Sequence, residues 1–185
     1  MRSVNAIPNF PSTGAVALRF APLAPLSFAA SRLARSLGSR HPALFRRLGD
    51  QAGKIFLLDP TDLPFAFLLS PRPEAPGLKA VRRERAGSWD ARVAGLLAAL
   101  IGLVHGAYDG DALFFSRDLV IEGDTEAVLA LRNAIDNEEI DLAREVAALF
   151  GPLESAAIGP SHLLSAFAAR WTGVALTRPE HGTRE

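Results

Sequence analysis

The residues best suited to chemistry stand together in the segment HGAYDGD. It contains His105, Asp109 and Asp111, and an imidazole with two carboxylates could bind a transition metal. The segment is rich in glycine and follows a long apolar stretch, so a solvated turn is the better interpretation. We therefore expect no metal site and no catalytic residue, and an enzyme that uses His105 is kept as an alternative.

Other catalytic patterns are missing from the sequence. There is no hydrolase elbow, phosphate-binding loop, dinucleotide fingerprint or zinc-ligand spacing. The chain has no cysteine, which excludes disulfides and thiolate metal sites. Arg82 and Arg83 with Trp89 could contact a phosphate or a nucleic acid, but the formal net charge of the chain is zero. We expect no cofactor and no nucleic-acid partner.

The clearest structural signal is a strand, a turn and a helix between residues 119 and 136. The apolar residues 119–121 predict a short buried strand. Gly123 suits the turn that follows, because glycine adopts backbone conformations that other residues resist. Asp124 is a good N-cap, since its carboxylate can accept hydrogen bonds from the first N–H groups of a helix. Apolar residues at helical spacing then predict an amphipathic helix.

This stretch also carries a family resemblance. Phe114 and Phe115, then the run LVIEGDTE over residues 119–126 and the helix after it, resemble the last strand and helix of the sterol carrier protein 2 (SCP-2) domain family. Within that family, residues 111–126 are most similar to a bacterial branch, the UbiT-type accessory factors of oxygen-independent ubiquinone biosynthesis. The resemblance extends back to residue 46 and is densest over its last quarter.

The resemblance implies an α+β fold, in which about five mostly antiparallel strands are covered by helices around an apolar cavity. It also implies a non-catalytic lipid-binding protein that presents or carries polyprenylated ubiquinone intermediates or phospholipid. The implied partners are this lipid and other ubiquinone biosynthesis proteins. The alternative is a structural adaptor or assembly factor, whose core is filled by its own side chains.

Short apolar runs predict the other strands of the sheet. Residues 54–59 and 64–69 predict an antiparallel pair across a proline-containing turn. Two further strands are expected over residues 78–85 and 88–93. The SCP-2-like lipid-binding domain is accordingly placed at residues 51–136.

Residues 95–104, GLLAALIGLV, would form a helix that is apolar on every side and too short to span a bilayer. Such a helix is either a central core helix or a wall of a lipid cavity. The candidate lipid-binding residues come from this helix and from the strands: Phe65, Phe67, Leu69, Leu96, Leu97, Leu100, Ile101, Val104, Phe114, Phe115, Leu119 and Ile121.

The first part of the chain is basic. Residues 1–25 hold four prolines and predict a flexible tail, whereas residues 26–50 predict basic amphipathic helices. Up to Lys54, eight basic residues accompany one acid, Asp50. The helices either approach an anionic membrane surface or pack on the sheet with their arginines in water. The candidate membrane-contact residues are Arg32, Arg35, Arg46 and Arg47.

The last part of the chain predicts two more amphipathic helices over residues 137–176 and a polar tail over residues 177–185. The beginning of the chain lacks the pattern of a secretory signal, and no apolar run reaches the length of a membrane span. We therefore expect a cytoplasmic protein, with peripheral association with the inner membrane as a further expectation.

Overall fold

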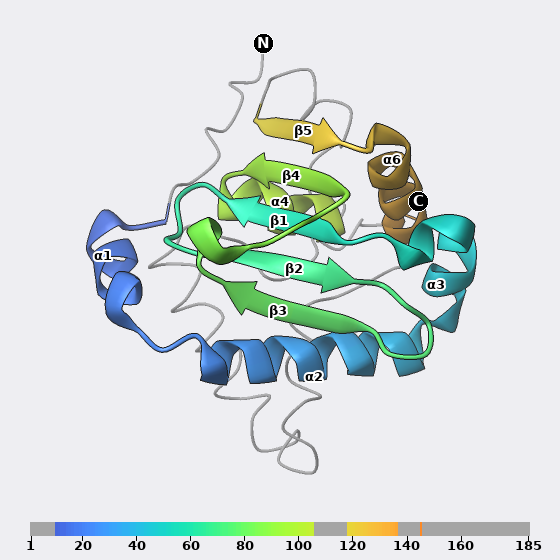
Figure 1. The fold of residues 1–185 in the computed structure, drawn as a ribbon, viewed down its shortest axis with the longest axis horizontal. Helices are drawn as coiled ribbons and strands as arrows, with labels where there is room; N and C mark the ends of the chain where they lie inside the picture. Colours follow the sequence, from blue (N-terminus) through green and yellow to red (C-terminus); the bar gives the residue numbers. More distant parts are fainter. Residues whose placement is uncertain (1–9, 106–117, 137–144, 146–185) are drawn as a thin grey trace, which may run out of the picture.

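The computed structural model describes residues 10–105, 118–136 and 145 of the chain. Helices and strands are mixed along it, which confirms the expected α+β class (Figure 1). In chain order the helices, 3-10 turns (η) and strands are α1 (Ser12–Phe20), α2 (Ala24–Arg40), α3 (Pro42–Leu48), η1 (Gly49–Gly53), β1 (Phe56–Pro60), β2 (Ala66–Ser70), β3 (Gly77–Val81), η2 (Arg83–Arg85), β4 (Ala91–Gly95), α4 (Leu97–His105), β5 (Leu119–Gly123) and α6 (Thr125–Asp136).

The five strands form one sheet in the order β3-β2-β1-β4-β5. β1 and β4 are parallel neighbours, whereas the other three pairings are antiparallel. The expectation of five mostly antiparallel strands is thus confirmed, with one parallel pair at the centre of the sheet. Parallel neighbours need a crossover connection, and residues 82–90, which include η2, cross in front of β1 in Figure 1.

Two expected strands have different bounds. The strand expected over residues 78–85 ends at Val81, because the chain then turns into η2. The strand expected over residues 88–93 begins only at Ala91. Gly87, with a φ of +70°, lies between them in a conformation that glycine adopts readily and extended strands do not use. These differences therefore come from the crossover.

In the described half of the flexible tail expected over residues 1–25, residues 12–20 form α1 and residue 24 begins α2. The flexibility of this segment stays a prediction. Two of the prolines suit helix starts. Pro11 directly precedes α1, and Pro25 lies in the first turn of α2, where a missing N–H group breaks no intrahelical hydrogen bond.

Arg82 ties α1 to the sheet. Its Nη1 donates to the carbonyl oxygen of Leu18 (3.1 Å), and its Nη2 donates to the carbonyl oxygen of Ala21 (2.7 Å). Both carbonyls lie at the C-terminal end of α1, where a cation also compensates the negative end of the helix dipole. A residue more than sixty positions away therefore holds the C-terminal end of this helix.

α2 runs along the outer edge of β3 (Figure 1). The hydroxyl of Ser27 donates to the carbonyl oxygen of Ala80 (3.0 Å) and accepts from the N–H group of the same residue (3.1 Å). The hydroxyl of Ser31 donates to the carbonyl oxygen of Leu78 (2.9 Å). The backbone groups at this edge, which would otherwise be open to another strand, are therefore bonded to side chains of a helix.

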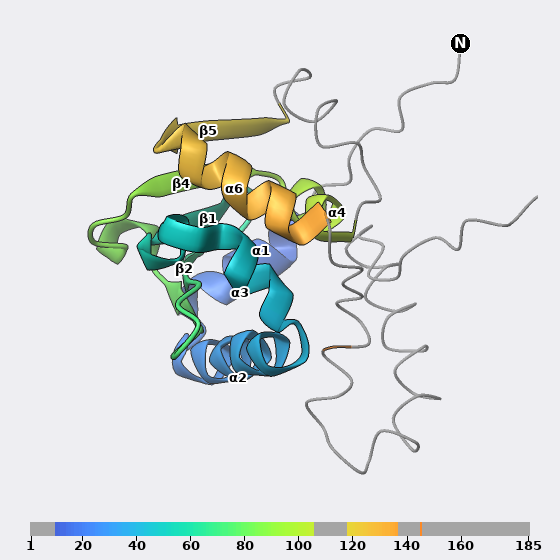
Figure 2. The ribbon, with the colours of Figure 1, turned by 90° about the vertical axis from the view of Figure 1, so that its right-hand side faces the viewer.

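The sheet separates two apolar clusters. The larger one lies on the helix-covered face, which α4, α3 and α6 flank in Figure 2. Its buried members are Leu44, Phe45, Leu48, Ala52, Phe56, Ala91, Val93, Ala99, Leu119, Ala127, Val128, Leu131 and Ala134. The smaller cluster lies on the opposite face, beneath the crossover, and contains Leu57, Ala66, Val81 and Ala86. One domain core is thus formed mainly between the sheet and its helices.

The helices expected over residues 137–176 and the tail expected over residues 177–185 lie outside the described residues, apart from Glu145. The carboxylate Oε1 of this residue lies 3.4 Å from Nε2 of His41, at the junction of α2 and α3. Its other oxygen lies 3.8 Å from Nε of Arg40. A residue beyond the sheet domain therefore contacts the helices that precede it.

Candidate functional site

The helix α4 lies against the sheet through its small residues. Ala98, Ala99 and Gly102 are buried, and small residues let a helix approach the backbone beneath it closely. The large apolar side chains of α4 all keep part of their surface accessible: Leu97, Leu100, Ile101, Leu103 and Val104. α4 is therefore not buried on every side as a central core helix would be, and its large side chains form an apolar wall that the core does not fully cover.

Asp62 fixes the start of α4. Its Oδ1 accepts a hydrogen bond from the N–H group of Leu97 (2.9 Å), and its Oδ2 accepts one from the N–H group of Phe10 (2.9 Å). The first N–H groups of a helix have no partner within the helix, so this carboxylate supplies one from a distant turn. It also connects α4 to the segment that leads into α1.

Gly95 allows β5 to approach the start of α4. A Cβ atom at this position would lie 2.6 Å from the carbonyl oxygen of Asp118 and 2.6 Å from Cδ2 of Leu119. Both distances are shorter than side-chain contacts in proteins, so a larger residue would push β5 away. The close approach places Leu119 in the core beside α4.

The structure brings half of the candidate lipid-binding residues into one cluster. Leu119 is buried in the larger core, and partly buried side chains pack against that core at Leu69, Leu96, Leu100, Val104 and Ile121. Leu97 and Ile101 lie on the same helix without joining the cluster. Phe65 and Phe67 form an edge-to-face ring pair, with centroids 5.5 Å apart. Phe114 and Phe115 lie outside the described residues. That these residues contact a ligand stays a prediction.

The turn between β5 and α6 agrees with the sequence pattern. Gly123 has a φ of +80°, and Oδ1 of Asp124 accepts a hydrogen bond from the N–H group of Ala127 (3.0 Å), so Asp124 caps α6. Nζ of Lys54 lies 3.2 Å from Oδ2 of the same carboxylate. The backbone hydrogen bond, followed by Lys54, lowers the pKa of Asp124 below its ordinary value of 3.8. These contacts are structural and point to no chemistry.

A buried ionic network lies on the face of the sheet opposite α4. Asp59 is fully buried. Its Oδ1 accepts from Nε of Arg83 (2.7 Å), and its Oδ2 accepts from Nε of Arg92 (3.0 Å). Arg92 also pairs with Glu122 (2.8 Å), and the hydrogen bond to Asp59 raises the pKa of Arg92 above its ordinary value. The local sequence signal for this network is a carboxylate directly after an apolar strand, which does not identify its partners.

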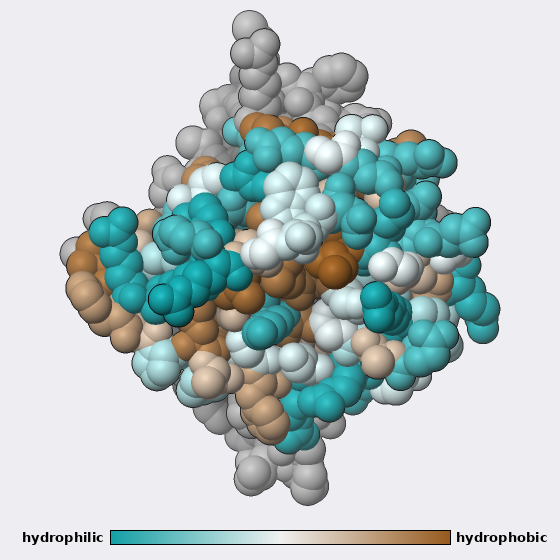
Figure 3. Space-filling view, in the orientation of Figure 1, coloured by the Kyte–Doolittle hydropathy of each residue, from teal (hydrophilic) through white to brown (hydrophobic). Residues whose placement is uncertain are grey.

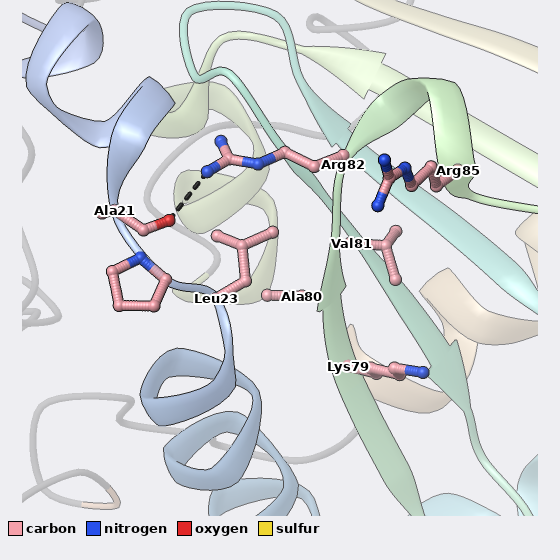
Figure 4. Close-up of a pocket in the computed structure, with 8 residues that line it drawn as sticks. Ala21, Leu23, Lys79, Ala80, Val81, Arg82 and Arg85 are labelled. Atoms are coloured by element: carbon pink, nitrogen blue, oxygen red, sulfur yellow. Dashed lines mark hydrogen bonds between the residues drawn. The ribbon is translucent and has the colours of Figure 1, made fainter.

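One pocket that described residues form lies away from α4. It is a surface depression of about 430 Å³ between the α1–α2 turn and the β3–η2 segment (Figure 4). Its lining residues are Ala21, Pro22, Leu23, Lys79, Ala80, Val81, Arg82 and Arg85. The apolar cavity expected between sheet and helices therefore stays a prediction, and sequence reasoning did not locate this basic pocket.

The arginines expected to contact a membrane are all exposed: Arg32, Arg35, Arg46 and Arg47. They lie on α2 and α3, and α2 turns its serines rather than these arginines toward the sheet. Their role at a membrane stays a prediction. Among the described residues, no helix has the length and apolarity needed to cross a membrane.

The expected absence of a metal site is tested only in part. His105 ends α4, but Asp109 and Asp111 lie outside the described residues. Within residues 10–105, 118–136 and 145, no group of three or more potential metal ligands occurs. The HGAYDGD segment therefore stays an untested candidate.

Comparison with known proteins gives one family. The profile of the SCP-2 sterol transfer family matches residues 35–136, which is more than half of the chain. No curated protein matches the chain significantly.

Among solved structures, one described as "UbiJ-SCP2 Ubiquinone synthesis protein" is 23% identical, with a TM-score of 0.49, over 63% of this chain and 93% of that chain. A crystal structure of sterol carrier protein 2 is 19% identical, with a TM-score of 0.45, over 61% of this chain and 91% of that chain. The apo form of sterol carrier protein 2 from Yarrowia lipolytica is 15% identical, with a TM-score of 0.43, over 61% of this chain and 94% of that chain.

Proposed function

This chain belongs to the SCP-2 sterol transfer family, and we propose that it is a non-catalytic protein that binds and carries a lipid. The finer proposal is that the lipid is a polyprenylated ubiquinone intermediate or a phospholipid, used in oxygen-independent ubiquinone biosynthesis together with other proteins of that process. The finer proposal rests on the resemblance of residues 111–126 to the accessory factors of that process.

The partly accessible apolar wall of α4 is the observation that carries the proposal. Leu100 and Val104 contact the core and still keep accessible surface, and Leu97 and Ile101 extend that surface along the helix. A soluble domain normally buries such side chains or uses the apolar patch for binding. An isoprenoid or acyl chain could cover the wall through contacts that need no polar group.

The energetics suit a carrier. Each methylene group removed from water contributes about 0.8 kcal/mol, so a chain of many methylenes binds an apolar wall strongly compared with water. Compared with a bilayer the gain nearly cancels, because the bilayer interior is equally apolar. A protein of this kind can therefore both take up a lipid from a membrane and release it.

The test is native mass spectrometry of the purified protein, with organic extraction of whatever is bound, followed by uptake of lipid from vesicles. We expect a phospholipid or an isoprenoid quinone precursor near one-to-one stoichiometry. An empty protein that also takes up no lipid would contradict the proposal and favour the structural adaptor.

Two double variants locate the binding surface. Leu97→Gln with Ile101→Gln makes the wall polar, and we expect it to raise the Kd for lipid at least tenfold, since about 1.4 kcal/mol corresponds to a factor of ten in Kd. The matched control is Val120→Gln with Leu129→Gln, which changes two exposed apolar side chains on β5 and α6. Equal losses in both variants would show that α4 is not the binding surface.

A further inference from the structure

The sheet has an open edge at β5 in the described part of the chain. β5 is the last strand in the order β3-β2-β1-β4-β5 and pairs with β4 along one side. At the opposite edge, side chains of α2 bond the backbone of β3. No described element lies beyond β5, which is the uppermost strand in Figure 1. The sheet can therefore accept another strand at β5.

The hydrogen bonds of β4 show which backbone groups of β5 face outward. The N–H group of Ala91 and the carbonyl oxygen of Gly95 bond residues that flank β1. The backbone groups of Arg92 therefore point the other way, to β5, where Arg92 is opposite Glu122. Because these groups alternate in direction along a strand, Ile121 turns its N–H and carbonyl groups to the outer edge. An extended chain placed there could bond both of them.

The side chains of β5 leave apolar surface at this edge. Leu119 and Ile121 pack on the core side of the sheet, so Val120 and Glu122 point to the opposite face. Val120 is 48% exposed. In Figure 3, hydrophobic surface in brown lies over β5, next to hydrophilic surface in teal. The strand contains no proline or lysine, which are residues that often protect an edge, and a strand beside it would cover Val120.

The sequence around β5 has one sign of charge. Residues 118–126 contain no basic residue and four acids: Asp118, Glu122, Asp124 and Glu126. Glu122 pairs with Arg92, and its side chain is still 47% exposed. Glu126 is exposed and forms no ion pair in the part of the chain that the structure describes. Charge complementarity therefore favours a partner with basic side chains.

The same charges oppose pairing of β5 with a second copy of itself. Antiparallel pairing about Ile121 would place Asp118 opposite Asp124 of the other copy. Pairing about Val120 would place Asp118 opposite Glu122. Like charges directly opposite each other on neighbouring strands are destabilising, so a copy of this chain fits the edge poorly.

We propose that the outer edge of β5 is a docking site for a basic, extended segment of a partner protein, which adds to the sheet as a further strand. Its backbone bonds Ile121, a lysine or arginine faces Glu122, and an apolar side chain covers Val120. Backbone bonds of this kind give affinity, and the side chains give specificity. This site does not depend on whether α4 binds a lipid.

The experiment measures binding of the full chain to a fluorescent peptide in which lysine and valine alternate, by fluorescence anisotropy. We expect this peptide to bind. The same peptide with methyl groups on alternate backbone nitrogens keeps its charge but cannot pair along one edge, so we expect it not to bind. Replacement of its lysines by glutamates should also abolish binding. Equal binding of the methylated peptide, or no binding of the first one, would overturn the proposal.

A pair of matched variants tests the location. Val120→Lys adds a positive charge to the edge, and we expect it to weaken binding of the basic peptide about fivefold, because like charges on neighbouring strands repel. Val16→Lys adds the same charge at an exposed apolar position of α1 and should bind as the unchanged protein does. Equal losses in the two variants would overturn the proposal. Thermal melting of both shows that they are folded.

Hydrogen exchange measured by mass spectrometry locates the bound peptide independently. The amides of residues 119–123 should exchange more slowly when the peptide is present, and protection confined to other segments would overturn the proposal. Sedimentation of the unliganded chain tests the second copy as occupant, since a dimer that Val120→Lys abolishes would assign the edge to self-association instead. The lipid content of Val120→Lys should be unchanged, which separates a failure of docking from a failure of cargo binding.

Discussion

At the scale of single residues, Asp59 is the most deeply buried charged residue in the described part of the chain. Its carboxylate is fully buried, and guanidinium groups from η2 and β4 bind both of its oxygens. Arg83 also donates to the carbonyl oxygens of Pro60 (3.1 Å) and Leu63 (3.0 Å), so the same network holds the β1–β2 turn. Asp59 is the fully buried member of this network, whereas the side chains of Arg83 and Arg92 are 37% and 23% exposed. Removal of an arginine would therefore leave a buried charge without a partner, which is costly.

We expect Asp59→Ala to lower the free energy of unfolding by about 1–3 kcal/mol, since it removes the hydrogen-bond acceptor that Arg83 and Arg92 share, while their partly exposed guanidinium groups can still be hydrated. Asp59→Asn should lower it less, because the amide oxygen can still accept one hydrogen bond. Urea unfolding followed by circular dichroism measures both. The control Asp50→Ala changes an exposed carboxylate and should stay within about 0.5 kcal/mol of the unchanged protein. Similar values for Asp59→Ala and Asp50→Ala would contradict a structural role for the network.

Sequence reasoning could not assign these partners. The apolar run before Asp59 predicted β1 correctly, but a charged residue after such a run is equally consistent with a turn in water. The residues that bury it stand 24 and 33 positions further along the chain. Only the parallel pairing of β1 with β4, which no local pattern specifies, brings Arg92 beside it.

At the scale of secondary-structure elements, α6 shows how a helix start responds to pH. The carboxylate of Asp124 accepts a hydrogen bond from the N–H group of Ala127 and forms an ion pair with Lys54. Both contacts favour the ionised carboxylate. Its pKa is therefore lower in the folded than in the unfolded protein. The stabilisation is complete above the ordinary value of 3.8 and is lost as the pH falls through the folded-state pKa.

We expect Asp124→Ala to lower the melting temperature at neutral pH, and the difference from the unchanged protein to shrink below pH 3.8. Asp124→Asn should give an intermediate melting temperature, because asparagine also caps helices but cannot pair with Lys54. Calorimetric melts between neutral and acidic pH measure the effect. A difference that stays constant with pH would contradict the role of the ionised carboxylate.

The elements predicted best are those with local signals. The strand at residues 119–121 and the helix up to Asp136 were confirmed as elements, because Gly123 and Asp124 mark the boundary between them within the chain itself. The expected burial of the strand was right only for Leu119, since Val120 is 48% exposed and Ile121 is partly buried. α1 was missed because prolines suggested a tail, whereas Arg82 holds its C-terminal end from a distance. The apolar segment at residues 95–104 was recognised as a helix, but no sequence pattern shows that its alanines are fully buried while its large side chains keep accessible surface.

At the scale of the whole molecule, the basic helices and the apolar wall occupy different regions. α2 follows the β3 edge of the sheet, whereas α4 lies on one face of it (Figure 2). Asp62 spans the two regions, since it binds the backbone of Phe10 before α1 and of Leu97 at the start of α4. The exposed arginines of α2 and α3 and the partly accessible apolar side chains of α4 therefore lie on different elements.

The β3 edge gives a prediction about self-association. We expect Ser27→Ala with Ser31→Ala to lower the free energy of unfolding by about 1–3 kcal/mol, because the backbone groups of Ala80 and Leu78 lose their partners. The variant should also form oligomers as its concentration rises, which light scattering detects. Ser39→Ala is the control, since that hydroxyl bonds only within α2. A variant whose particle size by light scattering stays equal to that of the control at every concentration would contradict the prediction.

A β-sheet is in principle a polymer that can grow by one strand at each free edge. In this protein the hydroxyl groups of two serines of α2 occupy the outward backbone groups of β3, so no further strand can pair there. The number of strands on that side is therefore set by the side chains of a helix and not by the sheet itself.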